Sequence, residues 1–252
     1  MSAHTSGMHL SGQKPFLHEI GCDLHVHVLP GIDDGSPDLM ESMQILEAHY
    51  EAGIRRVIAT PHIRSDFFQN TRQTIYDAWA LLHEQALQRW PDLRLTYAAE
   101  HFADDYLLQL IESDKLLPLF DRYVLIETSM RVEQPYFMEI VERLIEKNWK
   151  PVLAHPERYR PWHQKPDRYA QLREMQVIFQ VNLLSLGGMY GAPEQRMAEQ
   201  LIQKGWIGAV GTDLHRVSQF KYLRKAAQNP AYGRLCSVSL LNHQLLKHEA
   251  RN

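Results

Sequence analysis

Short apolar runs alternate with segments of helical periodicity along the chain. Turn-forming and polar residues bound the apolar runs, which is typical of strands buried on both faces of a parallel sheet. The runs that predict strands are 20–25, 57–60, 93–99, 123–126, 151–154, 177–181 and 207–210. Apolar residues at helical spacing predict helices between them, most clearly over 39–50, 75–90, 140–145, 193–205 and 240–246.

This alternation determines the expected fold class. Strands separated by helices form parallel βαβ units, and seven such strands favour an α/β fold built as a (β/α)7 barrel. An open doubly wound sheet is the alternative. We see no long linker, so we expect one domain over 19–252 after a flexible N-terminal tail, 1–18. The first helix has Ser36 as its expected N-cap, and Gly53 is expected to end it.

Composition narrows the function classes. The net charge of -3 over 252 residues leaves no basic excess for coating nucleic acid. Cys22 and Cys236 lie far apart, which favours a reducing compartment over a disulfide framework. We find no apolar stretch long enough to span a membrane and no apolar core of a secretory signal near residue 1, so we expect a cytoplasmic protein.

Histidine is the unusual residue, with 14 in the chain, and its placement decides the chemistry. Six of the seven predicted strands end in a side chain that can bind a metal. The carboxyl ends of parallel strands in a barrel open onto one face, where active sites are built. The residues expected to converge there are His25, His27, His62, Glu100, Glu127, His155, Asp213 and His215.

The residue types point to particular metals and to one kind of reaction. Alternate residues of a strand share a face, so His25 and His27 can reach one ion. Imidazole and carboxylate suit zinc, iron or manganese, and the absence of thiolates argues against a structural zinc site. The set is too large for one ion and predicts two or three. Sites with several metal ions can bind both the attacking and the leaving oxygen of a phosphate ester, and they generate hydroxide at neutral pH. We therefore predict a phosphohydrolase.

Neighbouring residues receive structural interpretations. Asp33 is expected to form a turn, and Asp23 to orient a ligand histidine. His49 and His101 are interpreted as surface or helix-face residues. The segment 187–191, GGMYG, matches neither a P-loop nor a dinucleotide motif. We expect it to let the backbone pass close to the rim of the site.

Motifs occur in a characteristic order from about residue 20 to about residue 220. They are DLHVHVLPGIDDG (23–35), TPH (60–62), AAE (98–100), LIETS (125–129), LAHPERY (153–159), QVNLLSLGGMYG (180–191) and GTDLH (211–215). On these segments the chain resembles the PHP (polymerase and histidinol phosphatase) superfamily. Within it, the chain looks like the bacterial manganese-dependent protein-tyrosine phosphatases of capsule and exopolysaccharide synthesis.

The resemblance implies a distorted TIM-like (β/α)7 barrel, the PHP fold, with a three-metal site, and it suggests Mn²⁺. The imidazole and carboxylate ligands also accept iron or zinc. The resemblance adds Asp34 to the metal ligands and implies that Arg158 binds the substrate phosphate. Asp213 and His215 would assist proton transfer while a metal-bound hydroxide attacks phosphotyrosine. The implied partner is a tyrosine-phosphorylated protein, such as the tail of a bacterial tyrosine kinase.

The segment after GTDLH departs from the family pattern. The family often continues with Asn and later an Arg-Pro pair, whereas 216–221 here reads RVSQFK. Arg216, Arg64 or Lys221 could serve as the second phosphate-binding cation. Two other functions stay open: a small-molecule phosphatase or phosphoesterase, for example one acting on histidinol phosphate, and a non-catalytic PHP module.

Overall fold

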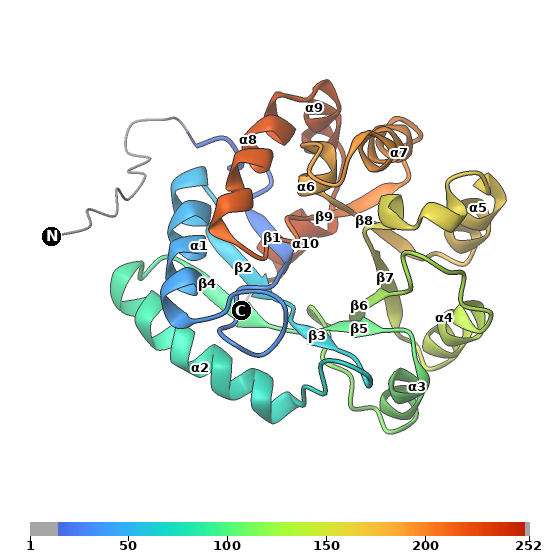
Figure 1. Ribbon diagram of the computed structural model, residues 1–252, viewed down its shortest axis with the longest axis horizontal. Helices are drawn as coiled ribbons and strands as arrows, with labels where there is room; N and C mark the ends of the chain where they lie inside the picture. Colours follow the sequence, from blue (N-terminus) through green and yellow to red (C-terminus); the bar gives the residue numbers. More distant parts are fainter. Residues whose placement is uncertain (1–14, 250–252) are drawn as a thin grey trace, which may run out of the picture.

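The computed structural model describes residues 15–249, in which helices surround a core of parallel strands (Figure 1). The strands are β1 (Cys22–Val26), β2 (Arg56–Ala59), β3 (His62–Ile63), β4 (Arg94–Tyr97), β5 (Glu100–Phe102), β6 (Tyr123–Glu127), β7 (Lys150–Ala154), β8 (Ile178–Asn182) and β9 (Ile207–Gly211). The α-helices are α1 (Leu39–Ala52), α2 (Arg72–Arg89), α3 (Asp105–Glu112), α4 (Phe137–Glu146), α5 (Pro166–Glu174), α6 (Leu183–Leu186), α7 (Ala192–Gln203), α8 (Phe220–Gln228), α9 (Pro230–Ser237) and α10 (Leu241–Glu249).

The strand order follows the chain. One sheet has the order β1-β2-β4 and the other β3-β5-β6-β7-β8-β9, with every pair parallel. The sheets are continuous in space, because Ala98 N–H donates to Ala59 O at 2.8 Å and Glu100 N–H to Pro61 O at 3.1 Å. Thus β2 with β3, and β4 with β5, are two interrupted strands. The prediction of an α/β fold with parallel strands is confirmed.

The last strand lies beside the first. A parallel bridge joins Val26 to Leu214, and Asp213 N–H donates to His25 O at 2.7 Å. His27 N–H donates to Leu214 O at 3.1 Å. This pairing brings the motif near residue 25 next to the motif near residue 213, although almost the whole domain separates them in sequence.

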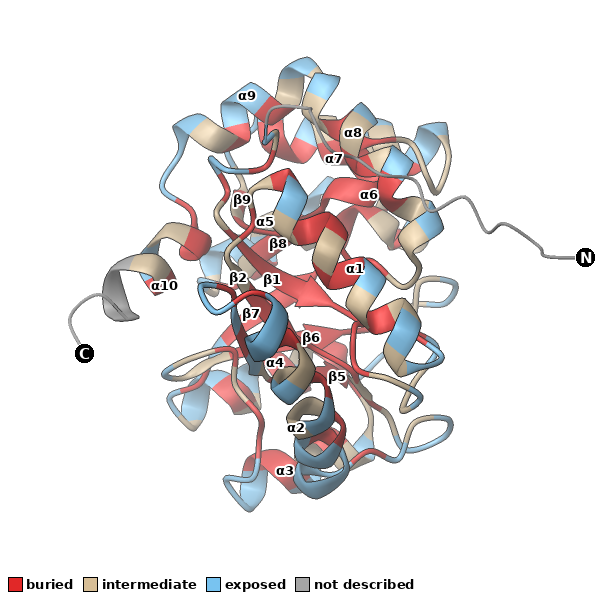
Figure 2. Cartoon of the chain, turned by 90° about the vertical axis from the view of Figure 1, so that its left-hand side faces the viewer, coloured by how far each residue is buried: buried red, intermediate tan, exposed pale blue. Residues whose placement is uncertain are grey.

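Buried residues of the strands and of the helices around them form the hydrophobic core (Figure 2). It has an inner cluster built mostly from strand residues and a larger outer cluster in which the helices pack on the strands. The inner cluster includes Cys22 and Leu24 of β1, and Leu241 and Leu245 of α10 pack against it. Val26 belongs instead to the outer cluster. The pairing register of β1 shifts between Asp23 and Val26, and such an irregularity re-aims side chains. It explains why His25 faces the inside.

The ends of the predicted elements need three corrections. Residues 1–14 of the predicted tail lie outside the described residues, but Leu17 is buried and its N–H donates to Ala52 O at 2.8 Å. The boundary predicted at residue 19 is therefore too late. Helix α1 is capped by Asp38, which accepts from Glu41 N–H, and not by Ser36, whereas Gly53 ends the helix as predicted with φ 99°. Helices α8 and α9 were not predicted.

Among the described residues, none of the helices combines the length and apolar character needed to cross a membrane.

Candidate metal centre and phosphate pocket

The candidate ligands lie together at the carboxyl ends of the strands. The elements β1, β3, β5, β6, β7 and β9, or the residues just after them, carry eight of them, and the loop after β1 carries Asp34. They form four overlapping groups whose ligand atoms lie within 4.8 Å of one another: His27, Asp34, His62 and His215; His25, Glu100 and His155; His25, His27 and Asp213; and His62, Glu100 and Glu127.

Glu100 lies at the centre of this cluster and is fully buried. Its Oε2 atom is 3.3 Å from the Nε2 atoms of both His25 and His27. The same oxygen is 3.1 Å from Nδ1 of His62, while Oε1 is 3.0 Å from Nε2 of His155. One carboxylate therefore faces four imidazoles, and Glu100 belongs to two of the four ligand groups.

The outer side of the cluster is more open. Asp34 is half exposed, and its Oδ1 lies 3.4 Å from Nε2 of His62 and 3.5 Å from Nε2 of His215. The His215 ring stacks on the His27 ring with centroids 4.2 Å apart. Because Asp34 comes from a loop and His215 from beyond β9, the group that contains both of them faces the exterior, where a substrate would enter.

Two candidate ligands have backbone conformations that are uncommon outside glycine. His155 has φ 34° and Asp213 has φ 57°. Non-glycine residues with positive φ are uncommon, and they cluster at functional sites where the surrounding fold enforces them. At these positions the conformation turns the chain directly after β7 and β9, where both side chains enter the cluster.

The cluster contains buried polar atoms that the protein itself does not satisfy. Nδ1 of His62, Oε2 of Glu100 and Nδ1 of His155 have no hydrogen-bond partner among the described residues. Buried polar groups are otherwise nearly always paired. His62 Nδ1 and Glu100 Oε2 lie 3.1 Å apart without hydrogen-bond geometry, so both can face a third atom. This donor set fits ions that take imidazole nitrogen and carboxylate oxygen.

In the metal-free cluster, electrostatic interactions favour protonated histidines beside ionised carboxylates. Burial opposes protonation of His62, but Glu127 and Glu100 outweigh it and raise its pKa to about 10. Burial opposes ionisation of Glu100 as well, yet His25 and His62 hold its pKa well below its usual range. Without metal, protons on the imidazoles therefore balance the carboxylates. A cation in the cluster would displace those protons.

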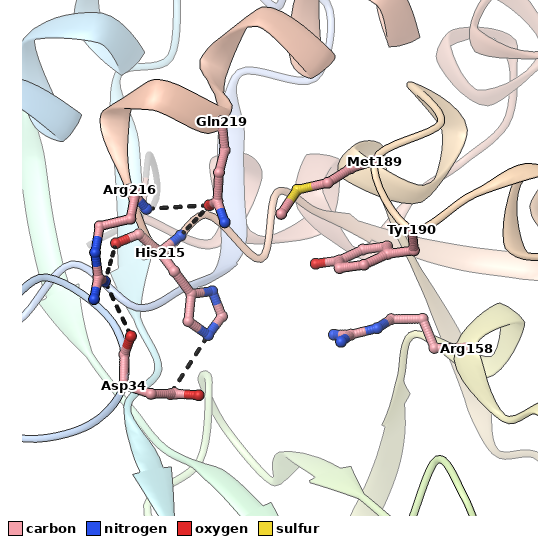
Figure 3. A pocket seen from close by; sticks show the side chains of 7 residues that line it. All are labelled: Asp34, Arg158, Met189, Tyr190, His215, Arg216 and Gln219. Atoms are coloured by element: carbon pink, nitrogen blue, oxygen red, sulfur yellow. Dashed lines mark hydrogen bonds and ion pairs between the residues drawn. The ribbon is translucent and has the colours of Figure 1, made fainter.

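A pocket of about 350 Å³ opens beside the cluster (Figure 3). Its lining residues are Asp34, Arg158, Met189, Tyr190, His215, Arg216 and Gln219. Arg158 donates from Nη1 to Asp213 Oδ2 at 2.7 Å, and its guanidinium lies 4.0 Å from the centre of the Tyr190 ring. Figure 3 shows the Arg158 side chain pointing into the space across from His215. A planar cation there suits an oxyanion.

The other two predicted phosphate-binding arginines are placed differently. Arg216 lines the pocket, but its Nη1 donates to the backbone carbonyls of Asp34, at 3.0 Å, and Gly35. It therefore holds the loop that carries Asp34. Arg64 pairs with Asp66 through two hydrogen bonds of 2.5 and 2.9 Å and does not line this pocket.

Comparison with known proteins identifies the family. The model of a family described as capsular polysaccharide synthesis, CpsB/CapC, matches residues 21–229. That range holds every candidate ligand and most of the fold. The chain belongs to the CpsB/CapC family.

Relatives with curated names agree with this membership. The tyrosine-protein phosphatase YwqE of Bacillus subtilis is 30% identical over 77% of both chains. The tyrosine-protein phosphatase CpsB of Streptococcus pneumoniae is 27% identical over 81% of this chain and 87% of its own. The chain also resembles a solved structure from a crystallographic description of YwqE of Bacillus subtilis and CpsB of Streptococcus pneumoniae, which calls them unique metal-dependent tyrosine phosphatases. The TM-score is 0.75 and the identity 28%, and the match covers 81% of this chain and 84% of that chain.

Several interpretations of neighbouring residues need correction. Asp33 does more than form a turn, since its Oδ2 lies 2.8 Å from Nδ1 of His27 and orients that ring. Asp23 contacts the backbone N–H of His25 at 3.1 Å rather than a ligand imidazole. His49 does lie on a helix, α1, but it is fully buried, and His101 is a fully buried residue of β5. Their burial was not predicted because it depends on segments distant in sequence, such as those of Asp23 and Leu125.

Sequence analysis also missed three polar residues on and after β8. Gln180 and Asn182 are fully buried beside the cluster, and the Tyr190 hydroxyl donates to Asp213 at 3.0 Å. A polar residue at every second position of a strand that otherwise reads as apolar was the available signal. The 187–191 segment does reach the rim of the site, because Met189 and Tyr190 line the pocket.

Proposed function

We propose that this member of the CpsB/CapC family is a metal-dependent protein-tyrosine phosphatase. The observation that carries the proposal is the buried cluster with unsatisfied His62, Glu100 and His155 atoms, directly beside a pocket lined by Arg158. The named relatives, which are tyrosine-protein phosphatases, support the same activity.

The proposed ligands are the nine residues of the cluster: His25, His27, Asp34, His62, Glu100, Glu127, His155, Asp213 and His215. The number of overlapping groups supports two or three ions, and we propose manganese, with iron or zinc as alternatives that the same ligand types accept. When bound, such ions lower the pKa of water and supply a nucleophile at neutral pH.

Side chains in and beside the pocket bind the phosphate and move protons. Arg158 binds the phosphate oxygens and stabilises the charge that spreads over them during transfer. His215, 19% exposed and at the pocket wall, and Asp213 are the groups placed to move a proton. Arg216 keeps Asp34 in position through its contacts with the loop backbone. Arg64 and Lys221 stay weaker candidates for phosphate binding.

The shape and chemistry of the pocket support phosphotyrosine as the substrate. Met189 and Tyr190 form an apolar wall next to Arg158, against which a phenyl ring can pack. Phenol has a pKa of about 10. Tyrosinate therefore leaves without the strong general acid that an alkyl phosphate requires.

The partner and cellular context are part of the proposal. We propose a tyrosine-phosphorylated protein as substrate, namely the tail of a bacterial tyrosine kinase of capsule or exopolysaccharide synthesis. The chain has only two cysteines, Cys22 and Cys236, which lie far apart in sequence; this supports a reducing compartment, and we propose a cytoplasmic location.

The test compares substrates that share the phosphate but differ in the leaving group. The manganese-loaded protein is assayed with a phosphotyrosine peptide, the matched phosphoserine peptide and histidinol phosphate. We expect kcat/KM to be highest for the phosphotyrosine peptide by at least about tenfold, the scale of one set of pocket contacts. Faster hydrolysis of histidinol phosphate would move the function to small-molecule phosphatases. Metal-loaded protein that hydrolyses none of the three would indicate a binding role.

A further inference from the structure

Strand β8 differs from its neighbours at the carboxyl end. It contributes none of the ligands in the four groups found among residues 15–249. It nevertheless carries two fully buried polar side chains, Gln180 and Asn182. Because alternate residues of a strand share a face, both point to the interior. Phe179, which precedes them, and Val181, which lies between them, belong to the outer core.

Gln180 and Asn182 form a continuous hydrogen-bonded chain between two candidate ligands. Nδ1 of His25 lies 2.7 Å from Gln180 Oε1. Gln180 donates from Nε2 to Asn182 Oδ1 at 2.8 Å. Asn182 then donates from Nδ2 to Asp213 Oδ2 at 2.6 Å. Each amide thus has its oxygen and its nitrogen committed to different partners.

The direction of this chain determines which atoms face the cluster. Since the Gln180 nitrogen is used on Asn182, its oxygen must face His25, so Nδ1 of His25 carries a hydrogen. Nε2 of His25 then faces Glu100 and the other ligands with its lone pair available once the site is loaded. At the other end, Asp213 Oδ2 accepts from Asn182, and Oδ1 is the oxygen nearest to His25, at 3.5 Å.

The backbone of β8 is itself held in place. Asn182 N–H donates to Oε1 of the buried Glu157 at 3.0 Å. Glu157 belongs to the 3-10 turn Pro156–Arg158, which directly follows the candidate ligand His155 and includes Arg158. The position of Asn182 is therefore fixed from the segment that contains both a ligand and the phosphate-binding arginine.

We propose that Gln180 and Asn182 are positioning residues of the metal centre, which set the ring orientation and tautomer of His25 and select Oδ1 of Asp213 as the ligand oxygen. The inference rests on the proposed function, since it assumes that the cluster binds metal. Outer hydrogen-bond partners of this kind orient ligands and affect metal affinity by about 10–100-fold.

The test measures Mn²⁺ affinity directly, by titration of the chelator-treated full-length protein. We expect Gln180→Leu and Asn182→Leu each to weaken Mn²⁺ binding at the site by about 10–100-fold. Gln180→Glu keeps an acceptor for His25 and is expected to recover part of this loss. The double variant is expected to lose less than the product of the two single effects, because both residues belong to one chain.

Asn242 provides a matched control. It is equally buried, but its amide bonds only to the backbone of Cys22 and Val210, away from the cluster. We expect Asn242→Ala to lower thermal stability and to leave Mn²⁺ affinity within about threefold, as for a site without shared partners. If the Leu variants do not fold, Asn182→Asp, which preserves shape but removes the donor to Asp213, carries the same measurement.

A spectroscopic readout separates positioning from general support of the fold. In the metal-free wild-type protein the His25 Nδ1–H should give a protected ring N–H resonance, which Gln180→Leu abolishes and Asn242→Ala retains. Folded Gln180 and Asn182 variants that bind Mn²⁺ as tightly as wild type would overturn this inference alone. Wild-type protein that binds no Mn²⁺ would overturn the metal site as well.

Discussion

Two buried polar clusters lie within a few residues of each other in this molecule, and they are built in opposite ways. At the seam between β1 and β9, Asp23 accepts from Thr212 and from the backbone of His25, and Nε2 of His49 lies 2.8 Å from its Oδ2. The atoms of this seam are paired within the protein. In the cluster around Glu100, several buried atoms have no partner among the residues described.

The difference distinguishes polar groups that hold a fold from polar groups prepared for a ligand. A buried network whose members are all satisfied stabilises and specifies the structure. A network with unsatisfied buried polar atoms reduces stability until something else binds. The same short segment, from Asp23 in β1 to His27 just after it, contributes to both clusters, so burial and residue type alone do not separate them. What separates the two clusters is whether every buried polar atom has a hydrogen-bond partner within the protein.

The largest expected effect comes from removing one ligand of the unsatisfied cluster. His155→Ala should reduce phosphotyrosine-peptide turnover by more than about a hundredfold, because even outer partners of metal ligands affect activity by about 10–100-fold. The bound metal per chain, measured by elemental analysis, should fall with it. Chelator-treated variant and wild type should unfold at similar temperatures. Full turnover in the variant would remove His155 from the site.

Asn242→Ala tests the opposite kind of group. Three hydrogen bonds to the backbone of Cys22 and Val210 are lost, and buried backbone atoms are left unpaired. The free energy of unfolding should fall by about 2–4 kcal/mol, measured by urea denaturation. Turnover per folded molecule should not change. A variant with normal stability and impaired metal binding would reverse the comparison.

His101 is a buried histidine of the satisfied kind, with Nδ1 facing Leu125 O and Nε2 accepting from Leu117 N–H. Burial lowers its pKa to about 4 from the usual 6.5. His101 therefore becomes protonated below about pH 6.5 in the unfolded chain but only below about pH 4 in the folded chain. Its contribution to stability is complete above that window and is lost as the pH falls through it.

This predicts an acid sensitivity that a substitution can remove. Between about pH 7 and about pH 5 the histidine accounts for a loss of about 2 kcal/mol in the free energy of unfolding. The chelator-treated variant His101→Gln, which keeps a donor and an acceptor, should lose correspondingly less than wild type over the same range. Equal losses in the two proteins would contradict the neutral, buried state of His101.

Arg158→Lys has the smallest expected effect and examines the pocket rather than the ligands. Lysine keeps the charge but loses the planar pair of donors and the stacking on Tyr190. The kcat/KM for a phosphotyrosine peptide should fall by about tenfold, with bound metal unchanged, because Arg158 contacts Asp213 only through Oδ2. A parallel loss of metal would show that Arg158 supports the ligands instead.

The sequence predicts the strands and the convergence of their ends well, because both follow from local periodicity and from the geometry of parallel sheets. It predicts less about what surrounds the ligands. Gln180 and Asn182 reach His25 and Asp213 only through folding, and the buried positions of His49 and His101 depend on segments distant in sequence. The cap at Asp38 in place of Ser36 is a local choice between neighbouring capping residues.

The central claim is that the unsatisfied cluster is a metal site that makes the protein a tyrosine phosphatase. Phosphate release from a phosphotyrosine peptide, measured together with metal content after chelation and during stepwise return of Mn²⁺, tests it most directly. The account predicts that release falls to background on chelation and returns as the cluster refills with more than one ion per chain. Metal-free protein that releases phosphate at the original rate would contradict it.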